Sequence, residues 1–193
     1  THYTPSIAAA LGELRDSRAL TIPVVYNTSS FDSLEALGLM RGKVDVYLAD
    51  FKYASALEAG KLSHAPRYPE IALAAIEEMV AQVPVWEEDD EGLLLKGVIV
   101  RHLVLPGRVE ESKRALATLH DRFGSGVRLS IMSQYTPLAS GLERYGLAGR
   151  VTEEEYEEVL DYADSLGVED YFWQQGDAAQ ESFVPEFNGE GVR

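Results

Sequence analysis

The sequence has no cysteine among its 193 residues. A chain without cysteine forms no disulfide, offers no thiolate nucleophile and holds no metal through sulfur. Thiol chemistry therefore gives no indication of the cellular compartment. It also excludes every enzyme class in which this chain alone would supply a catalytic or metal-binding cysteine.

Basic residues are scarce, because 17 Lys and Arg stand against 32 Asp and Glu and leave a formal charge of −15. This charge argues against a nucleic-acid backbone or an anionic membrane as the main partner. No apolar run reaches the roughly 20 residues that a membrane helix needs, and no basic and apolar leader opens the chain. We therefore expect a soluble, cytoplasmic protein that binds neither nucleic acid nor membrane.

Familiar catalytic signatures are also missing. The sequence has no glycine-rich phosphate loop, no nucleophile elbow and no Ser-His-Asp order. His2, His64 and His102 share no helical or strand spacing that favours chelation, either together or with Asp50. We therefore predict no metal site from the residues of this chain.

Apolar strands alternate with segments of helical periodicity along the chain, and 46% hydrophobic content is enough for one domain with a core. The patterns predict strands over residues 22–28, 44–50, 97–105 and 127–133. They predict helices over 5–17, 54–60, 67–82 and 109–123, with shorter or later ones in "FDSLEAL" and "TEEEYEEVLDYADSLG". The third strand, in "LLLKGVIVRHLVL", is almost uninterruptedly apolar, which predicts helices on both faces of the sheet.

Two helix starts have recognisable signals. Thr4 stands before Pro5, as an N-cap residue followed by proline in the first turn would. Asp32 and Glu35 have the spacing of a capping box. We expect Thr4 and Asp32 to cap these two helices.

Strands alternating with helices at this spacing indicate parallel βαβ units with right-handed crossovers. In such sheets, functional residues gather at the carboxyl ends of the strands. The unusual polar residues of this sequence fall at those predicted ends, namely Asn27, Thr28, Asp50, Lys52, Arg101, His102 and the segment 133–135. We expect these residues to lie at the same edge of the sheet.

Two charged residues in "VDVYLADFKY" alternate to the same side of the chain, Asp50 and Lys52. Burying either one alone is costly, so each needs a partner, solvent or a ligand. A structural ion pair satisfies this requirement. The alternative is a Schiff-base lysine of a barrel aldolase, in which a desolvated Lys52 acts as the nucleophile.

The next polar pair, Arg101 and His102, points to opposite sides of its strand. The planar fork of Arg101 suits a carboxylate or phosphate ligand, or a neighbouring acidic side chain. His102 is best interpreted as a hydrogen-bonded core histidine. Gln134 and Tyr135 in "SQYTP" suit packing and turn roles as well as ligand contacts.

Five segments, taken in order and at their spacing, resemble radical S-adenosylmethionine proteins: "THY", "YNTS", "D-x-YL-x-DFKY", "RHLVLPG" and "MSQYTP". The resemblance is to relatives of pyruvate formate-lyase activating enzyme and extends to about residue 175. It implies the third to sixth strands of a partial TIM-type (βα)6 barrel, truncated at its N-terminus. Residues 1–150 would form the barrel, and 151–193 a C-terminal helix and tail that pack on it.

The resemblance also implies a set of cofactor contacts. Asn27 stands where the activating enzyme has an aspartate, and Thr28 matches the threonine that follows, near the methionine carboxylate and a monovalent cation. Asp50 and Lys52 would face the cleft that holds cofactor and substrate, and Arg101 the methionyl group. Tyr135 stands where the family has a histidine near the cofactor. The changed residues at 27 and 135 leave the cation and the substrate undefined.

The family's cluster motif, C-x3-C-x2-C, and its Gly-Gly-Glu segment are absent from the sequence, which begins at Thr1. Both precede the matching region in the family, so truncation explains their absence. The resemblance then implies an intact parent that binds S-adenosylmethionine and a [4Fe–4S] cluster and generates a 5′-deoxyadenosyl radical. A glycyl radical enzyme would be its protein partner. This chain alone would be inactive, because it lacks the three thiolates that hold the cluster.

Two alternatives remain. One is a complete barrel lyase or aldolase that uses Lys52, and the other is a binding module without catalysis. A truncated barrel would also expose the edge of strand 22–28, which invites pairing with another chain. Self-association through that edge is therefore expected.

Overall fold

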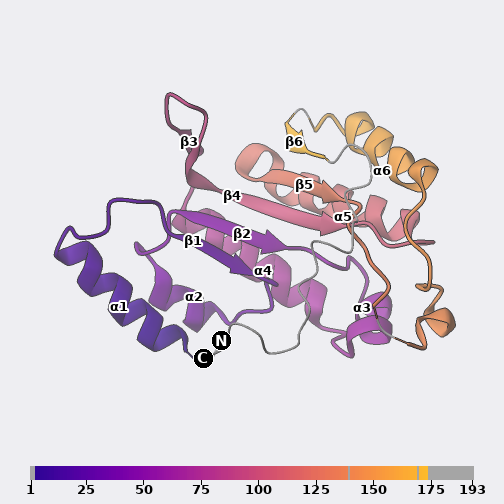
Figure 1. Ribbon diagram of the computed structural model, residues 1–193, viewed down its shortest axis with the longest axis horizontal. Coiled ribbons are helices and arrows are strands. Elements are labelled where there is room, and N and C mark those ends of the chain that lie inside the picture. Colours follow the sequence, from indigo (N-terminus) through magenta and orange to yellow (C-terminus); the bar gives the residue numbers. More distant parts are fainter. Residues whose placement is uncertain (1–2, 139, 169, 174–193) are drawn as a thin grey trace.

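The chain forms one parallel β-sheet flanked by helices, as the computed structural model in Figure 1 shows. The structure describes residues 3–138, 140–168 and 170–173. The helices are α1 (Thr4–Asp16), α2 (Leu34–Met40), α3 (Ala56–Ser63), α4 (Tyr68–Gln82), α5 (Val109–Phe123) and α6 (Glu153–Ser165). The strands are β1 (Val25–Thr28), β2 (Val46–Asp50), β3 (Glu87–Glu88), β4 (Leu94–Leu103), β5 (Arg128–Met132) and β6 (Tyr171–Phe172).

The strand order is β1-β2-β4-β5-β6, and all these neighbours are parallel. The short β3 pairs antiparallel with the beginning of β4. The prediction of four adjacent parallel strands is confirmed, with boundaries that differ by at most three residues. The result is an α/β architecture whose parallel strands deliver their carboxyl ends to the same edge.

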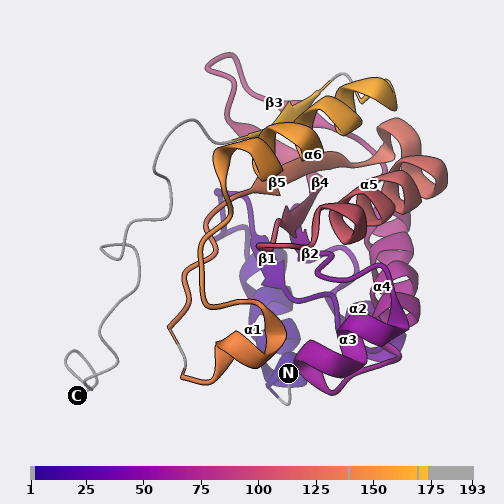
Figure 2. The same cartoon turned by 90° about the vertical axis from the view of Figure 1, so that its right-hand side faces the viewer.

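The two faces of the sheet differ. Tyr47 and Ala49 of β2, and Val98 and Val100 of β4, are buried together with apolar residues of α4 and α5. Figure 2 looks onto the carboxyl ends of the strands and shows α4 and α5 together on one side of them. The helices form one layer in which α2 contacts α4, and α5 contacts α6. This layer provides the main hydrophobic core, where each fully buried leucine contributes about 1.5–3 kcal/mol.

The opposite face is partly open. Ile99, Arg101 and Leu103 alternate with the buried residues of β4 and are each partly exposed. The expectation of helices on both faces is therefore wrong for the described residues. The apolar residues of β4 on this face, Ile99 and Leu103, are partly exposed instead of lying under a second helical layer, and Leu103 lines a cavity.

The helix starts also correct two expectations. Tyr3, not Thr4, is the N-cap residue of α1, and Thr4 lies buried in the first turn. Ser33, not Asp32, caps α2, since its side chain accepts a hydrogen bond from Ala36 N. Asp32 instead accepts a hydrogen bond from the Thr28 hydroxyl. Ser33 has a capping ability similar to that of Asp32, whereas the side chain of Tyr3 makes no cap hydrogen bond.

The last helix, α6, begins with a complete capping box between Thr152 and Glu155. It packs against α5, and the Tyr156 hydroxyl donates to Ile131 O at the end of β5 over 2.7 Å. The expected tail beyond β6 lies outside the described residues. In the described part of the chain, no helix combines the length and apolar character that crossing a membrane requires.

Candidate functional site at the carboxyl edge of the sheet

Three neighbouring strands bring polar side chains together on the open face. In the sheet, Asp50 of β2 pairs with Arg101 of β4. Asn27 of β1 pairs with Leu48, which lies two residues before Asp50 on β2. The predicted meeting of Asn27, Asp50, Lys52 and Arg101 at one edge therefore agrees with the structure. Strand register places Asn27, Asp50 and Arg101, whereas Lys52 lies in the loop just after β2.

Arg101 is the centre of this cluster. Its Nε donates to Asp50 Oδ1 over 2.8 Å, and its Nη2 donates to Asn27 Oδ1 over 2.7 Å. Its Nη2 also lies 2.6 Å from Asp50 Oδ1, and the two side chains are 23% and 19% exposed. The guanidinium is thus fixed by two strands, with further N–H groups left for a ligand.

Lys52 lies just beyond β2, on the same side as Asp50. Its Nζ is 3.6 Å from Asp50 Oδ2, an ion pair longer than a hydrogen bond, and its side chain is 47% exposed. Asp50 therefore faces Arg101 with one oxygen and Lys52 with the other. The same-side arrangement that the sequence predicted is present, and it takes the form of an ion pair.

Tyr68, at the start of α4, holds the end of β2 through hydrogen bonds between its hydroxyl and the backbone. Its hydroxyl lies 2.9 Å from Asp50 O and 3.0 Å from Ser29 O, and accepts a hydrogen bond from Lys52 N over 3.0 Å. Burial raises the pKa of Tyr68, so the hydroxyl stays protonated and can donate. Sequence reasoning missed Tyr68, because a tyrosine in an apolar helix gives no sign of the backbone groups it will meet.

Glu111 of α5 holds the loop after Lys52. It is buried, and its Oε1 accepts from Ala54 N over 2.8 Å and from Ser55 N over 2.7 Å. Burial acts to raise the pKa of Glu111, but hydrogen bonds from Arg114 and from these backbone groups outweigh it and leave the pKa lowered. Glu111 was also missed, because its position on the helix looks like an ordinary exposed first-turn acid.

His102 points away from the cluster, as predicted. It is buried beside α5, where Nδ1 lies 2.8 Å from Phe51 O and Nε2 lies 3.0 Å from Ser112 Oγ. Burial lowers the pKa of His102 despite the hydrogen bond to Phe51 O. His102 is therefore a neutral core histidine that ties β4 to the loop after β2.

Thr28 and Tyr135 lie apart from the charged cluster. The Thr28 hydroxyl donates to Asp32 and accepts from Ser30 N over 3.0 Å, on the side of β1 opposite Asn27. The Tyr135 hydroxyl donates to Leu147 O over 2.8 Å, and burial raises its pKa. Thr28 therefore shapes the loop after β1, and Tyr135 presents mainly its ring.

A cavity of about 450 Å³ opens beside the cluster. Its polar lining consists of Asp50, Lys52, Arg101 and Gln134, and its walls are aliphatic and aromatic: Tyr53, Leu62, Leu103, Leu105, Met132, Tyr135, Leu142, Tyr145 and Leu147. This size lies in the range of small-ligand pockets. The wall contributed by residues 142–147 was not anticipated, because nothing in that segment's pattern places it over β4.

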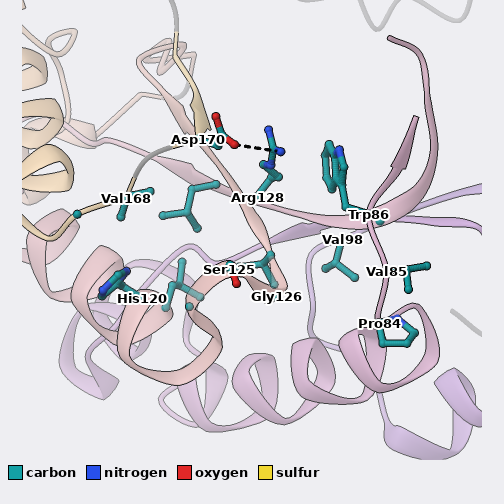
Figure 3. A pocket seen from close by; sticks show the side chains of 16 residues that line it. Pro84, Val85, Trp86, Val98, His120, Ser125, Gly126, Arg128, Val168 and Asp170 are labelled. Atoms are coloured by element: carbon teal, nitrogen blue, oxygen red, sulfur yellow. Dashed lines mark ion pairs between the residues drawn. The ribbon is translucent and has the colours of Figure 1, made fainter. Parts of the chain in front are cut away.

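A second cavity, of about 250 Å³, lies at the opposite, amino edge of the strands (Figure 3). Arg128 lies over the Trp86 ring, 4.6 Å from its centroid, and forms an ion pair with Asp170 at 3.1 Å. The charges at this edge are thus paired with each other. The carboxyl edge remains the candidate site, since ligands of such sheets bind there.

The donor groups present do not fit every cofactor. Within the described ranges, no group of three or more His, Cys, Asp or Glu side chains is arranged to hold a metal ion. The complete absence of cysteine leaves no ligands for an iron–sulfur cluster in this sequence. A zwitterion is a better match, since Arg101, Asn27 and Asp50 supply groups for a carboxylate and an ammonium.

No protein-family model matches the sequence. The chain is similar to "Uncharacterized protein MJ0674" of Methanocaldococcus jannaschii, with 28% identity over 148 residues. The similarity covers 77% of this chain and 40% of that protein, so this chain spans well under two thirds of the length of its relative.

Proposed function

We propose that this chain is the C-terminal part of a radical S-adenosylmethionine enzyme and forms the wall against which the cofactor's methionyl group binds. The observation that carries the proposal is the Asn27, Arg101 and Asp50 cluster at the carboxyl ends of three adjacent parallel strands. The greater length of the archaeal relative, of which the similarity covers 40%, is consistent with a longer parent protein.

The cluster suits a zwitterionic ligand. Arg101 has N–H groups that remain available for the ligand carboxylate, since Nε and Nη2 already bind Asp50 and Asn27. Asp50 Oδ2 faces Lys52 only across 3.6 Å, so an ammonium group can approach this oxygen. S-adenosylmethionine, bound beside a reduced cluster, supplies hydrogen-abstraction chemistry. In the proposed complex, Arg101 and Asp50 would hold the carboxylate and the ammonium group of the cofactor and so fix its orientation.

The open sheet face supports the barrel part of the proposal. A (βα) barrel has helices outside and side chains inside, and here one face is covered by α4 and α5 while the other carries the cluster. We propose that the sheet is one part of a (βα)6 barrel whose remaining strands and cluster cysteines come from outside this sequence. A protein with a glycyl radical site is the proposed reaction partner.

The test uses the complete reading frame that encodes this chain, prepared anaerobically with iron and sulfide. We expect reductive cleavage of S-adenosylmethionine, and Arg101→Gln should weaken its binding about tenfold or more, as loss of a charge-assisted contact does. The matched control is Arg128→Gln, which breaks an ion pair at the opposite edge. A reading frame without cysteine, or cleavage unaffected by Arg101→Gln, contradicts the proposal.

The 193-residue chain alone should bind S-adenosylmethionine weakly. The cofactor loses the iron that its amino and carboxylate groups would chelate, and the remaining partly exposed polar contacts contribute about 0–1 kcal/mol each. Micromolar binding needs about 8 kcal/mol. Tight binding of the cofactor by the short chain in titration calorimetry would argue against this assignment of the cluster.

The environment of Lys52 does not favour the alternative of a Schiff-base lyase. Lys52 is 47% exposed and ion-paired with Asp50, whereas such a lysine needs a desolvated pocket. Borohydride trapping with small aldehydes and ketones should leave Lys52 unlabelled. A substrate-dependent adduct at Lys52 in mass spectrometry would favour the lyase function over the radical-enzyme function. A binding module without catalysis is the third alternative.

A further inference from the structure

We infer that the cavity beside the cluster takes a small carboxylic acid with an apolar body, and that Lys52 binds its carboxylate. This inference deepens the proposed function and rests on it in one respect, because it assigns Asp50 and Arg101 to the cofactor. It names the chemical class of the second molecule at the same site.

The charge of the cavity differs in sign from that of the chain. Among the described residues, two cations, Lys52 and Arg101, and one carboxylate, that of Asp50, line the cavity, whereas the whole chain has a formal charge of −15. A local excess of positive charge in an acidic protein raises the local concentration of anions. The cavity is therefore selective for an anionic group.

Of the two cations, Lys52 is the one free to bind a second ligand. Arg101 already donates to Asp50 and Asn27. The Lys52 ammonium has three donors and lies 3.6 Å from its ion-pair partner among the described residues, Asp50. Lys52 N donates a hydrogen bond to the Tyr68 hydroxyl. This bond fixes the backbone at Lys52, whose side chain lines the cavity.

The rest of the lining is apolar. Besides the leucines and Met132, the rings of Tyr53 and Tyr135 face the cavity, and their hydroxyls are engaged with Ser63 Oγ at 2.9 Å and Leu147 O at 2.8 Å. These tyrosines thus offer ring surface more than hydrogen bonds. A ligand that fits has one anionic end and an aliphatic or aromatic body.

A carboxylate fits better than a phosphate. Phosphate sites use several backbone N–H groups, often from glycine-rich turns, or a set of cations. The described residues that line this cavity include no glycine, and Lys52 is a single point charge. The single Lys52 ammonium beside apolar cavity walls therefore suits a ligand with one negative charge, such as a carboxylate.

The test measures binding of four probes with the same ring to the 193-residue chain by titration calorimetry and by amide NMR shifts. The probes are 3-phenylpropionate, 3-phenylpropanol, 3-phenylpropylamine and phenyl phosphate. We expect the carboxylate to bind at least tenfold more tightly than the alcohol and the amine, and more tightly than the phosphate. Equal affinity for all four probes, or the strongest binding to the phosphate, would overturn the inference.

Two variants locate the carboxylate contact. Lys52→Met should remove the tenfold preference while the alcohol affinity stays unchanged, and Lys52→Arg should retain most of it. Lys61→Met is the matched control, because Lys61 lies on α3 outside the cavity and is similarly exposed. A carboxylate preference that survives Lys52→Met contradicts the assignment to Lys52.

The result is separable from that of the proposed function. The probes need neither the cluster nor the cofactor, so a parent protein that fails to cleave S-adenosylmethionine leaves the carboxylate preference standing as a property of the cavity. Conversely, cleavage by the parent together with no carboxylate preference in the chain refutes this inference alone.

Discussion

Asp50 and Arg101 occupy paired positions on the adjacent parallel strands β2 and β4, and Arg101 Nε donates to Asp50 Oδ1 over 2.8 Å. Both side chains are mostly buried, and both lie on the open face of the sheet. The pair joins the two central strands at the edge where ligands of parallel sheets bind. It therefore has a structural role that is measurable without any ligand.

A double-mutant cycle with Asp50→Asn and Arg101→Gln should give a coupling energy of about 1–2 kcal/mol, between that of exposed ion pairs and that of charge-assisted hydrogen bonds. Urea unfolding of the four proteins measures it. The pair formed by Glu87 and Lys96 is the comparison, because both side chains are about half exposed and solvent screens them. A coupling no larger than that of the comparison pair would contradict the prediction.

Tyr68→Phe should destabilise the chain by about 1–2 kcal/mol, because Lys52 N, Asp50 O and Ser29 O would lose their shared, partly buried hydrogen-bond partner. Hydrogen exchange at the Lys52 amide should accelerate as well. Tyr53→Phe is the control, since among the described residues the hydroxyl of Tyr53 hydrogen-bonds with the Ser63 hydroxyl and with no backbone group. If both variants lose equal stability and the Lys52 amide stays protected, Tyr68 does not fix this strand end.

Much of the fold follows from local patterns. The alternation of apolar strands with amphipathic helices predicted the parallel order, because parallel neighbours need long crossover connections. It also predicted that Asn27, Asp50 and Arg101 would meet, since consecutive parallel strands share one carboxyl edge. These features depend only on period and order, which the sequence shows directly.

Other features depend on contacts between distant segments. The buried tyrosine at 68 and the buried glutamate at 111 hydrogen-bond to backbone groups far away in sequence, and no local period identifies them. The single helical layer was also missed, because the partly exposed Ile99 and Leu103 of the open face have the same apolar character as residues buried under helices. Helix capping by Ser33 instead of Asp32 was decided by the bond between Asp32 and Thr28.

The buried His102 should make stability depend on pH. Burial lowers its pKa in the folded chain, so below the unfolded value of about 6.5 the unfolded chain binds a proton that the folded chain does not. The free energy of unfolding should then fall by up to about 1.4 kcal/mol per pH unit below that value. Urea unfolding between pH 7.5 and 5.5 measures this slope, and His102→Gln should reduce it. Parallel slopes for the two proteins would contradict the prediction.

Gly97 in the middle of β4 is required by Trp86. A Cβ atom at this position would lie 2.6 Å from Cε3 of the indole ring. Gly97→Ala should therefore cost about 1–3 kcal/mol, as overpacking does, and shift the Trp86 fluorescence. Combining it with Trp86→Leu should recover most of that loss, measured relative to Trp86→Leu alone. A Gly97→Ala variant as stable as the parent chain would contradict the prediction.

Strand β1 ends the sheet, since it pairs with β2 on one side only among the described residues. Its Val25 side chain is 56% exposed, and Ile22 just before the strand is more exposed still. An apolar edge of this kind can pair with another chain. We therefore expect concentration-dependent self-association of the 193-residue chain, measured by sedimentation velocity. Val25→Lys should shift the association constant about tenfold toward the monomer, because the charges of two copies would face each other across the new pair.

The control for this last prediction is Val85→Lys. Val85 is 53% exposed, much like Val25, but it lies before β3 beside the cavity at the amino edge of the sheet. The Val85→Lys substitution adds the same charge to the chain as Val25→Lys, so it measures any effect of net charge on association. If Val85→Lys dissociates the chain as well as Val25→Lys does, association depends on charge alone and not on the free edge of β1. If the unmodified chain stays monomeric at all concentrations, that edge is protected in solution despite its exposure.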